Sequence, residues 1–429
     1  MNREILRLAI PNILSNISVP LLSTVDTALM GRLSELHIGA VGLGAMIFNF
    51  VYWNFGFLRM GTTGLTAQAY GKHDEQNIIL TLGRAMVVAI LLAVLVILLQ
   101  FPLAHLSFTL LNVHTDQLPL VQTYFGIRIW AAPATLALYA LLGWFFGMQN
   151  AIYPLVLTIV INVVNIVCSY LFIVKWGMEV DGVAWGTVVA QYIGVLLALG
   201  LFAYRYGTLL RKLRWQLLQQ WEALSRFLQL NADIFLRTFC LTFAFGFFYS
   251  QSSNSGDLIL AANVILLQYL NWMSYGVDGF AFASESLVGK YAGAANEQKT
   301  RRAIRLCFWW GMTLAALFSL VYGLGGDAIL QVYTDQTDVI AAARPFLFWM
   351  VLFPLLSTPC YLWDGIFIGL TAARAMRNSM LLALLVYVLS WYIFRTLGNH
   401  GLWLALLLFM IFRALFQFYL FRKRGMQLK

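Results

Sequence analysis

The chain has 429 residues, of which 61% are apolar and only 11% are charged, and its formal net charge is +10. A soluble domain carries roughly 25% charged residues, so a water-soluble protein of this composition would lack the polar groups to cover its surface. The basic residues form short clusters between apolar runs instead of one patch, which excludes a nucleic-acid-binding surface and indicates a membrane protein.

Apolar runs, taken in chain order, predict an all-α protein that crosses the membrane twelve times, because a crossing takes about 20 apolar residues. The second, eighth and tenth runs are long, so we expect these helices to tilt or to project beyond the bilayer. We expect the first run to be a retained span and not a cleaved signal. The predicted limits are 8–30, 38–70, 79–104, 120–147, 153–174, 182–204, 226–250, 258–289, 303–325, 341–370, 376–396 and 401–421.

The basic residues also predict the orientation of the spans. Of the 28 Lys and Arg residues, four lie deep inside predicted spans and only four, Arg32, Lys175, Arg344 and Arg395, lie on the outer side. The remaining twenty lie on the side of the N-terminus. Since basic residues concentrate in cytoplasmic loops, we expect both termini to be cytoplasmic in a multi-pass protein of the bacterial inner (plasma) membrane.

Similar segments recur at a nearly constant spacing. GTTGLTAQAYGK (61–72) resembles GFAFASESLVGK (279–290), GWFFGMQNA (143–151) resembles GIFIGLTAA (365–373), and GVAWG (182–186) resembles GLWLA (401–405). In all three pairs the second segment follows the first by almost the same number of residues. This indicates two six-helix lobes in a parallel repeat, related by a pseudo-two-fold axis along the membrane normal. We place the N-terminal lobe at 1–204, a cytoplasmic linker at 205–225 and the C-terminal lobe at 226–429.

One acidic residue of the first lobe, Asp26, falls within a predicted span, where an ionisable group is costly and is functional by default. On the fifth span Asn162, Asn165 and Ser169 share a helix face, and Thr187 lies five residues inside the outer start of the sixth span. At 1.5 Å per residue, Asp26, Ser169 and Thr187 lie roughly 6–9 Å below the outer boundary, with Asn165 slightly deeper. A partly dehydrated carboxylate with amide and hydroxyl partners predicts a proton or small-cation site. The alternative is a helix-packing network without a transport role.

Acidic residues of the second lobe break the repeat symmetry. Asp364 lies in the inner half of the tenth span and is the candidate for a substrate contact or a second-lobe site. Asp278 and Glu285 share one face of the eighth span, where a structural ion pair is as reasonable as a functional role. For Asp233 we expect a pair with Arg237, four residues away on the same helix.

Two prolines interrupt the first span, and each removes one backbone hydrogen bond. Pro20 precedes Asp26 by six residues, and Pro11 lies deeper toward the N-terminus. Either proline is a candidate hinge that couples protonation to helix shape, and the alternative is a static kink.

Four motifs occur in order along almost the whole chain: VDTALMGRL, then NIVCSYLF followed by GVAWGTVVAQYIG, then DGFAFASESLVGK, then WDGIFIGLTAARAMRNSM. As an ordered set they resemble the multidrug and toxic compound extrusion family, and in particular its DNA-damage-inducible (DinF) branch. The resemblance implies twelve helices in two lobes that export amphipathic, often cationic compounds in exchange for a cation or proton.

The resemblance also assigns roles to individual positions. It implies that Asp26 is the coupling carboxylate, that Asn165 and Thr187 complete its network, and that Pro11 is the bending proline. Some relatives carry a second aspartate where this chain has Ser169. One carboxylate fewer weakens a sodium site, so the departure favours protons.

We therefore predict a secondary antiporter that exports amphipathic or cationic compounds by alternating access in exchange for protons. Two alternatives stay open: a sodium-coupled drug exporter, and a lipid-linked precursor flippase of the same superfamily. We expect no enzymatic centre, since HExxH, GxSxG and Cys/His clusters are missing from the sequence. We expect no cofactor and no metal apart from the coupling proton or sodium ion. The expected partners are small amphipathic molecules and the lipid bilayer, without nucleic acid, and the expected state is a monomer.

Overall fold

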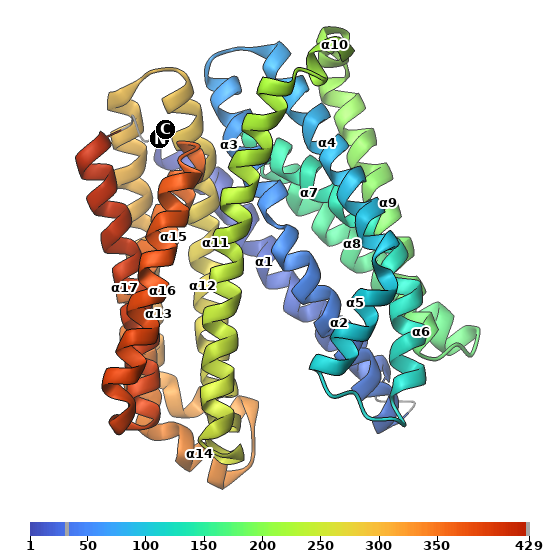
Figure 1. Ribbon diagram of the computed structural model, residues 1–429, viewed down its shortest axis with the longest axis vertical. Coiled ribbons are helices and arrows are strands. Elements are labelled where there is room, and N and C mark those ends of the chain that lie inside the picture. The colour runs from blue at the N-terminus through green and yellow to red at the C-terminus, as the bar shows by residue number, and fades with distance from the viewer. Residues whose placement is uncertain (31–33, 426–429) are drawn as a thin grey trace. The chain divides into compact units, whose positions relative to one another are not determined.

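The computed structural model describes residues 1–30 and 34–425, except for the side chains of residues 19, 21–30, 35 and 424. Helices make up almost all of this part of the chain, and no strand occurs in it. This confirms the predicted all-α class. A helix satisfies its own backbone hydrogen bonds, which is why apolar runs of this length fold as helices in lipid. The chain packs as two compact units (Figure 1), Leu14–Phe227 and Leu228–Lys429, the second of which also includes Met1–Ile13.

The unit Leu14–Phe227 holds most of α1 and the helices up to α10. Trp144 is fully buried in its core and donates from Nε1 to the carbonyl of Ile78 at 3.0 Å. Short 3-10 turns at Ile129–Ala131 and Gly207–Lys212 and a π-helical turn at Leu171–Lys175 join its helices. Its helices are α1 (Asn2–Met30), α2 (Glu35–Phe55), α3 (Phe57–Gly71), α4 (Glu75–Leu98), α5 (Gln100–Leu110), α6 (Leu118–Arg128), α7 (Ala132–Gly147), α8 (Ile152–Tyr170), α9 (Val180–Tyr206) and α10 (Trp215–Leu218).

The other unit holds the remaining helices together with the first turns of α1. Glu4 of α1 accepts hydrogen bonds from Lys290 at 3.2 Å and from Tyr291 at 3.1 Å. Short 3-10 turns lie at Arg344–Phe346 and Arg395–Leu397. Its helices are α11 (Trp221–Asn254), α12 (Asp257–Gly293), α13 (Glu297–Tyr333), α14 (Thr337–Ala343), α15 (Leu347–Gly369), α16 (Ala373–Phe394) and α17 (Asn399–Arg424).

Eleven segments of the described chain are long and apolar enough to cross a membrane, and they coincide with the predicted second to twelfth spans. The predicted first span falls on α1, which is helical over 29 residues. The predicted second span is broken at Gly56 into α2 and α3, whereas its counterpart in the repeat, α12, is one helix of 37 residues.

Backbone geometry supports the internal repeat. The second of the three sequence matches pairs position 143 with position 365, and the same offset pairs His73 with Ala295 and Gln149 with Thr371. All four of these residues follow the end of a helix and have a positive φ. Such a conformation is uncommon outside glycine, so two matched pairs are a strong structural signal. The register of the first match, which aligned the Gly-Lys pairs, was wrong by one turn, because α3 ends at Gly71 and α12 ends at Gly293.

The repeated scaffold packs through matched glycines within each unit. On α7, a Cβ at Gly143 would meet the carbonyl of Arg59 on α3. On α15, a Cβ at Gly365 would meet the carbonyl of Ala281 on α12. The two glycines are equivalent positions of the repeat, so both lobes use the same close helix contact, and they differ in the polar groups placed around it.

Candidate functional site

A neutral hydrogen-bond network joins α8 to α9. The amide Nδ2 of Asn165 donates to the hydroxyl of Thr187 at 2.8 Å, and that hydroxyl donates to the carbonyl of Val183 at 3.1 Å. The hydroxyl of Ser169 donates to Oδ1 of Asn165 at 3.5 Å. Asn165, Ser169 and Thr187 are all buried, so these bonds fix the direction of the amide in a site with little water.

Close packing brings this network together. Gly186 of α9 lies directly against Ser169, and a Cβ there would run into the Ser169 hydroxyl and backbone. α8 then ends in the π-helical turn Leu171–Lys175, one residue after Tyr170. π-helical turns are rare in proteins, and those that do occur often lie at functional sites. The predicted shared depth of Asn165 and Thr187 thus corresponds to a direct contact.

The third predicted member of the α8 face reaches a different helix. Asn162 is half-buried, and its Nδ2 lies 3.1 Å from the hydroxyl and 3.3 Å from the carbonyl of Ser18 on α1. The Ser18 hydroxyl in turn donates to the carbonyl of Ser15 at 2.7 Å. The polar face of α8 therefore contacts α9 at one level and α1 at another.

The remaining predicted residues of this site lie on α1. The backbone of α1 is helical through Asp26, but the side chain of Asp26 lies outside the described residues. α1 continues through both Pro11 and Pro20. The division between the two units falls between Ile13 and Leu14, two residues after Pro11. The roles of Asp26, Pro11 and Pro20 stay predictions.

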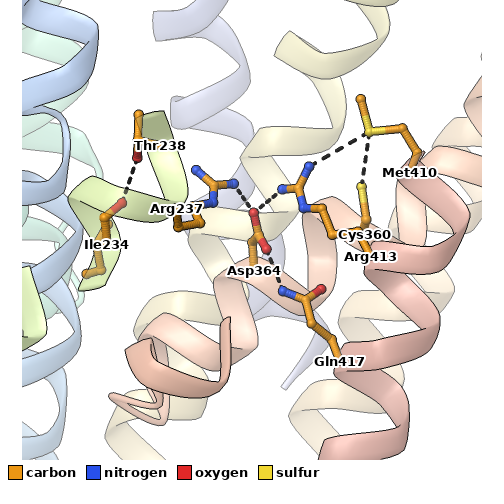
Figure 2. A network of polar contacts seen from close by, with 8 residues as sticks. All are labelled: Ile234, Arg237, Thr238, Cys360, Asp364, Met410, Arg413 and Gln417. Carbon is orange, nitrogen blue, oxygen red and sulfur yellow. Dashed lines mark hydrogen bonds and ion pairs between the residues drawn. The ribbon is translucent and has the colours of Figure 1, made fainter. Parts of the chain in front are cut away.

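A charged cluster occupies the second unit (Figure 2). Asp364 of α15 accepts hydrogen bonds from the guanidinium groups of Arg237 on α11 and Arg413 on α17. Its other oxygen, Oδ1, accepts from Gln417 at 2.7 Å. All four side chains are buried. Two cations and one anion share this place.

The cluster corrects one sequence interpretation. The expected pair between Asp233 and Arg237 within α11 was wrong, because Arg237 pairs with Asp364. Asp233 pairs instead with Arg377 of α16, with Oδ1 2.5 Å from Nη1. Each of the two side chains found a partner on another helix, and helical spacing carries no information about such partners.

Sequence reasoning also missed part of the charged cluster. Arg413 lies deep inside the predicted twelfth span and is a counter-ion of Asp364. Gln417 was not singled out, although it lies four residues after Arg413 and so on the same helix face. Glu285 is buried on α12, on the helix face that it was predicted to share with Asp278. The roles of Asp278 and Glu285 stay predictions.

Within the described residues, no group of three or more His, Cys, Asp and Glu side chains is placed to hold a metal ion. The four cysteines, Cys168, Cys240, Cys307 and Cys360, are free thiols.

Comparison with known proteins agrees with this architecture. The MatE family model matches residues 11–171 and 234–393. The chain is 38% identical to DNA damage-inducible protein F of Escherichia coli, over 96% of this chain and 90% of that protein. It is 26% identical to human multidrug and toxin extrusion protein 1, over 96% of this chain and 73% of that protein. A solved MATE structure in the bent conformation has a TM-score of 0.90 at 19% identity, over 99% of this chain and 95% of that one.

The repeated helical units with buried polar networks define a polytopic membrane transporter. The chain belongs to the MatE family, the multidrug and toxic compound extrusion transporters. The resemblance drawn from the ordered sequence motifs is thereby confirmed.

Proposed function

We propose that this chain exports amphipathic, often cationic organic compounds across the bacterial inner membrane in exchange for protons. Membership of an efflux family supports export, and the human relative is named for multidrug and toxin extrusion. The excess of basic residues on one side supports cytoplasmic termini. The transported molecules and the bilayer are its partners, nucleic acid is not, and the chain works as a monomer without a cofactor.

One observation carries the proton assignment. The buried network on α8 and α9 consists of Asn165, Ser169 and Thr187, which are all neutral. Asp26 of α1 adds a single carboxylate at the same predicted depth. A proton needs only one carboxylate, whereas a sodium site is weakened by the lack of a second carboxylate at the position of Ser169. One acid with neutral partners therefore suits a proton better than sodium.

A change of conformation must accompany proton binding for exchange to occur. Protonation drives export only where the two states of the carboxylate favour different conformations. α1 is suited to this role, because it contributes to both units and contains Pro11 next to the division between them. Protonation from outside would load Asp26 and release the compound, and loss of the proton to the more alkaline interior would reset the helix.

Efflux from proteoliposomes tests the proposal. Vesicles would contain the purified protein and ethidium as the cationic probe, with a pH gradient and a sodium gradient imposed separately. We expect the pH gradient alone to drive ethidium against its concentration gradient. Ethidium efflux driven by the sodium gradient alone would contradict proton coupling and would show that the coupling ion is sodium. Movement under neither gradient, with folded protein in the vesicles, would overturn the assignment as an exporter of this class of compound.

A further inference from the structure

α16 and α17 pack along each other (Figure 1). Side chains of these two helices line a groove between them. Its volume is about 760 Å³, within the roughly 300–1,000 Å³ of small-molecule sites. Both helices contribute side chains to its wall, and the main ones are Arg374, Asn378 and Leu382 of α16 and Phe412, Phe416 and Leu420 of α17.

The two ends of the groove differ in chemistry. α16 begins at Ala373 and α17 ends at Arg424, so the antiparallel pair places Arg374 level with Leu420 and Leu382 level with Phe412. The eight residues from Arg374 to Leu382 rise about 12 Å along the helix. The groove is therefore cationic where the helices reach the membrane surface and apolar one to two turns deeper.

The cationic end has an excess of positive charge. Arg377 donates to Asp233 at 2.5 Å and to Asn378 at 2.9 Å, so its guanidinium is held in place. Arg374 is 60% exposed, and its Nε lies 4.0 Å from Asp233, at the limit of an ion pair. Two guanidinium groups face one carboxylate, which leaves a net charge of about +1 at this end of the groove.

The apolar wall is continuous. Phe412 and Phe416 are one turn apart on α17, and their ring centroids are 5.8 Å apart. Leu382 of α16 and Leu415 of α17 add exposed aliphatic surface. A soluble anion would contact the cationic end and leave the apolar wall uncovered. A zwitterionic lipid would cover the apolar wall but would bring no net negative charge to the cationic end.

We propose that this groove binds an anionic phospholipid. Its phosphate would contact Arg374, and one acyl chain would lie along Leu382, Phe412 and Phe416. Basic pockets between membrane helices recognise acidic headgroups in this way, and each basic residue near the surface adds about 1 kcal/mol. The binding site is separate from the buried networks of Asn165 and Asp364, so it does not depend on the proposed transport chemistry.

Native mass spectrometry and thermal unfolding in detergent test the proposal with defined lipids. Phosphatidylglycerol should be retained on the wild-type protein and should raise its Tm, whereas phosphatidylcholine should do neither. Arg374→Gln should weaken phosphatidylglycerol binding roughly fivefold, since a fivefold change is about 1 kcal/mol. Arg302→Gln is the matched control, because Arg302 is also an exposed arginine near a helix start but lies on α13.

The acyl-chain part of the groove needs its own pair of variants. Leu382→Asn should reduce phosphatidylglycerol retention, while Leu385→Asn, an exposed leucine of the same helix that is not part of the groove wall, should not. Equal losses for Arg374→Gln and Arg302→Gln would overturn the site, as would equal retention of the two lipids. Stabilisation by inorganic phosphate to the same extent as by phosphatidylglycerol would make it a soluble-anion site and would also overturn the proposal.

Discussion

The polar centres of the two units are built from different groups on the same repeated scaffold. In the first unit Asn165, Ser169 and Thr187 form a neutral network between neighbouring helices. In the second, Asp364 is held by Arg237 and Arg413, and these three residues lie on three helices. The matched glycines Gly143 and Gly365 show that the underlying helix contacts are alike.

The difference in charge gives the two centres different tolerance to change. A neutral network loses one hydrogen bond when a member is replaced, at a cost of roughly 1–3 kcal/mol for the group left unpaired. A buried ion cluster loses its balance of charge, which costs roughly 3–5 kcal/mol when one partner is removed. We therefore expect the charged centre to hold its unit together and the neutral centre to be free to respond to a titrating neighbour.

The largest effect should follow Asp364→Asn. The change leaves two buried arginines beside each other without an anion, so we expect a loss of roughly 3–5 kcal/mol and little folded protein. Tryptophan fluorescence during thermal unfolding in detergent measures it, and Asp257→Asn, an exposed acid at the start of α12, is the control. A Tm equal to that of the wild type would show that the cluster is not structural. The double variant Asp364→Asn with Arg237→Gln has one unpaired buried cation fewer, so we expect it to be more stable than Asp364→Asn alone.

Asp26→Asn should have the opposite profile, with a folded protein that no longer transports uphill. The amide is nearly isosteric and cannot titrate, and each unit of pH difference supplies about 1.4 kcal/mol only through a proton that is bound and released. Ethidium efflux under a pH gradient should stop, while ethidium binding should persist with a flattened pH dependence. Continued uphill efflux with an unchanged pH response would move the coupling role to Asp278 or Asp364.

Thr187→Val should have an intermediate effect. Valine keeps the shape but leaves Nδ2 of Asn165 without its acceptor, at a cost of roughly 1–3 kcal/mol. Thr158→Val on α8 is the matched control, because the Thr158 hydroxyl bonds only to the carbonyl of Pro154 within its own helix among the contacts described. Thermal unfolding and the efflux rate measure the difference. If the two variants behave alike, the contact between Asn165 and Thr187 contributes nothing specific.

Two glycines of α9 test the close contact between α8 and α9 at the neutral network, with a smaller expected effect. A methyl group at Gly186 meets Ser169, whereas Gly200 has open space around it. Gly186→Ala should cost about 1–3 kcal/mol through overpacking. Gly200→Ala should be neutral or stabilising by up to about 1 kcal/mol, since alanine favours a helix over glycine. Thermal unfolding that ranks the two variants in the reverse order would contradict the close approach of α8 and α9.

The smallest effect concerns the helix caps at Asp74 and Asn296, which are equivalent positions of the repeat. Asp74 accepts from the backbone of Asn77 at 3.0 Å, and Asn296 accepts from Lys299 at 2.9 Å. The Asn77 N–H holds the pKa of the Asp74 carboxyl below its ordinary value of 3.8. A lowered pKa means that the stabilisation is present above pH 3.8 and is lost as the pH falls through the folded-state value.

The pH dependence of thermal unfolding should therefore carry a small contribution from Asp74 on the acid side, worth less than about 1 kcal/mol. Asp74→Asn should remove this contribution and make the first cap like the second. Asn296→Asp should introduce it at the second cap. An acid limb that is unchanged in both variants would show that titration of an aspartate at these caps does not contribute to stability.

The sequence alone determined the membrane spans and the similar depth of Asn165 and Thr187. Helix length is a local property of an apolar run, so the spans could be predicted to within several residues. α8 and α9 are consecutive and antiparallel and are joined by a short connection, so residues of similar predicted depth, such as Asn165 and Thr187, lie close together. The repeat was visible in sequence, although the exact register of one match needed the helix ends.

Only the tertiary structure decided which charges meet in the second unit. Arg237, Asp364 and Arg413 lie on α11, α15 and α17, and Arg237 and Asp364 are 127 positions apart in the chain. Sequence gives the depth of such residues in the membrane, but not the direction in which a helix turns them or which helix lies alongside. For this reason Asp233 was assigned to Arg237, its neighbour in sequence, while packing placed Arg377 of α16 against it.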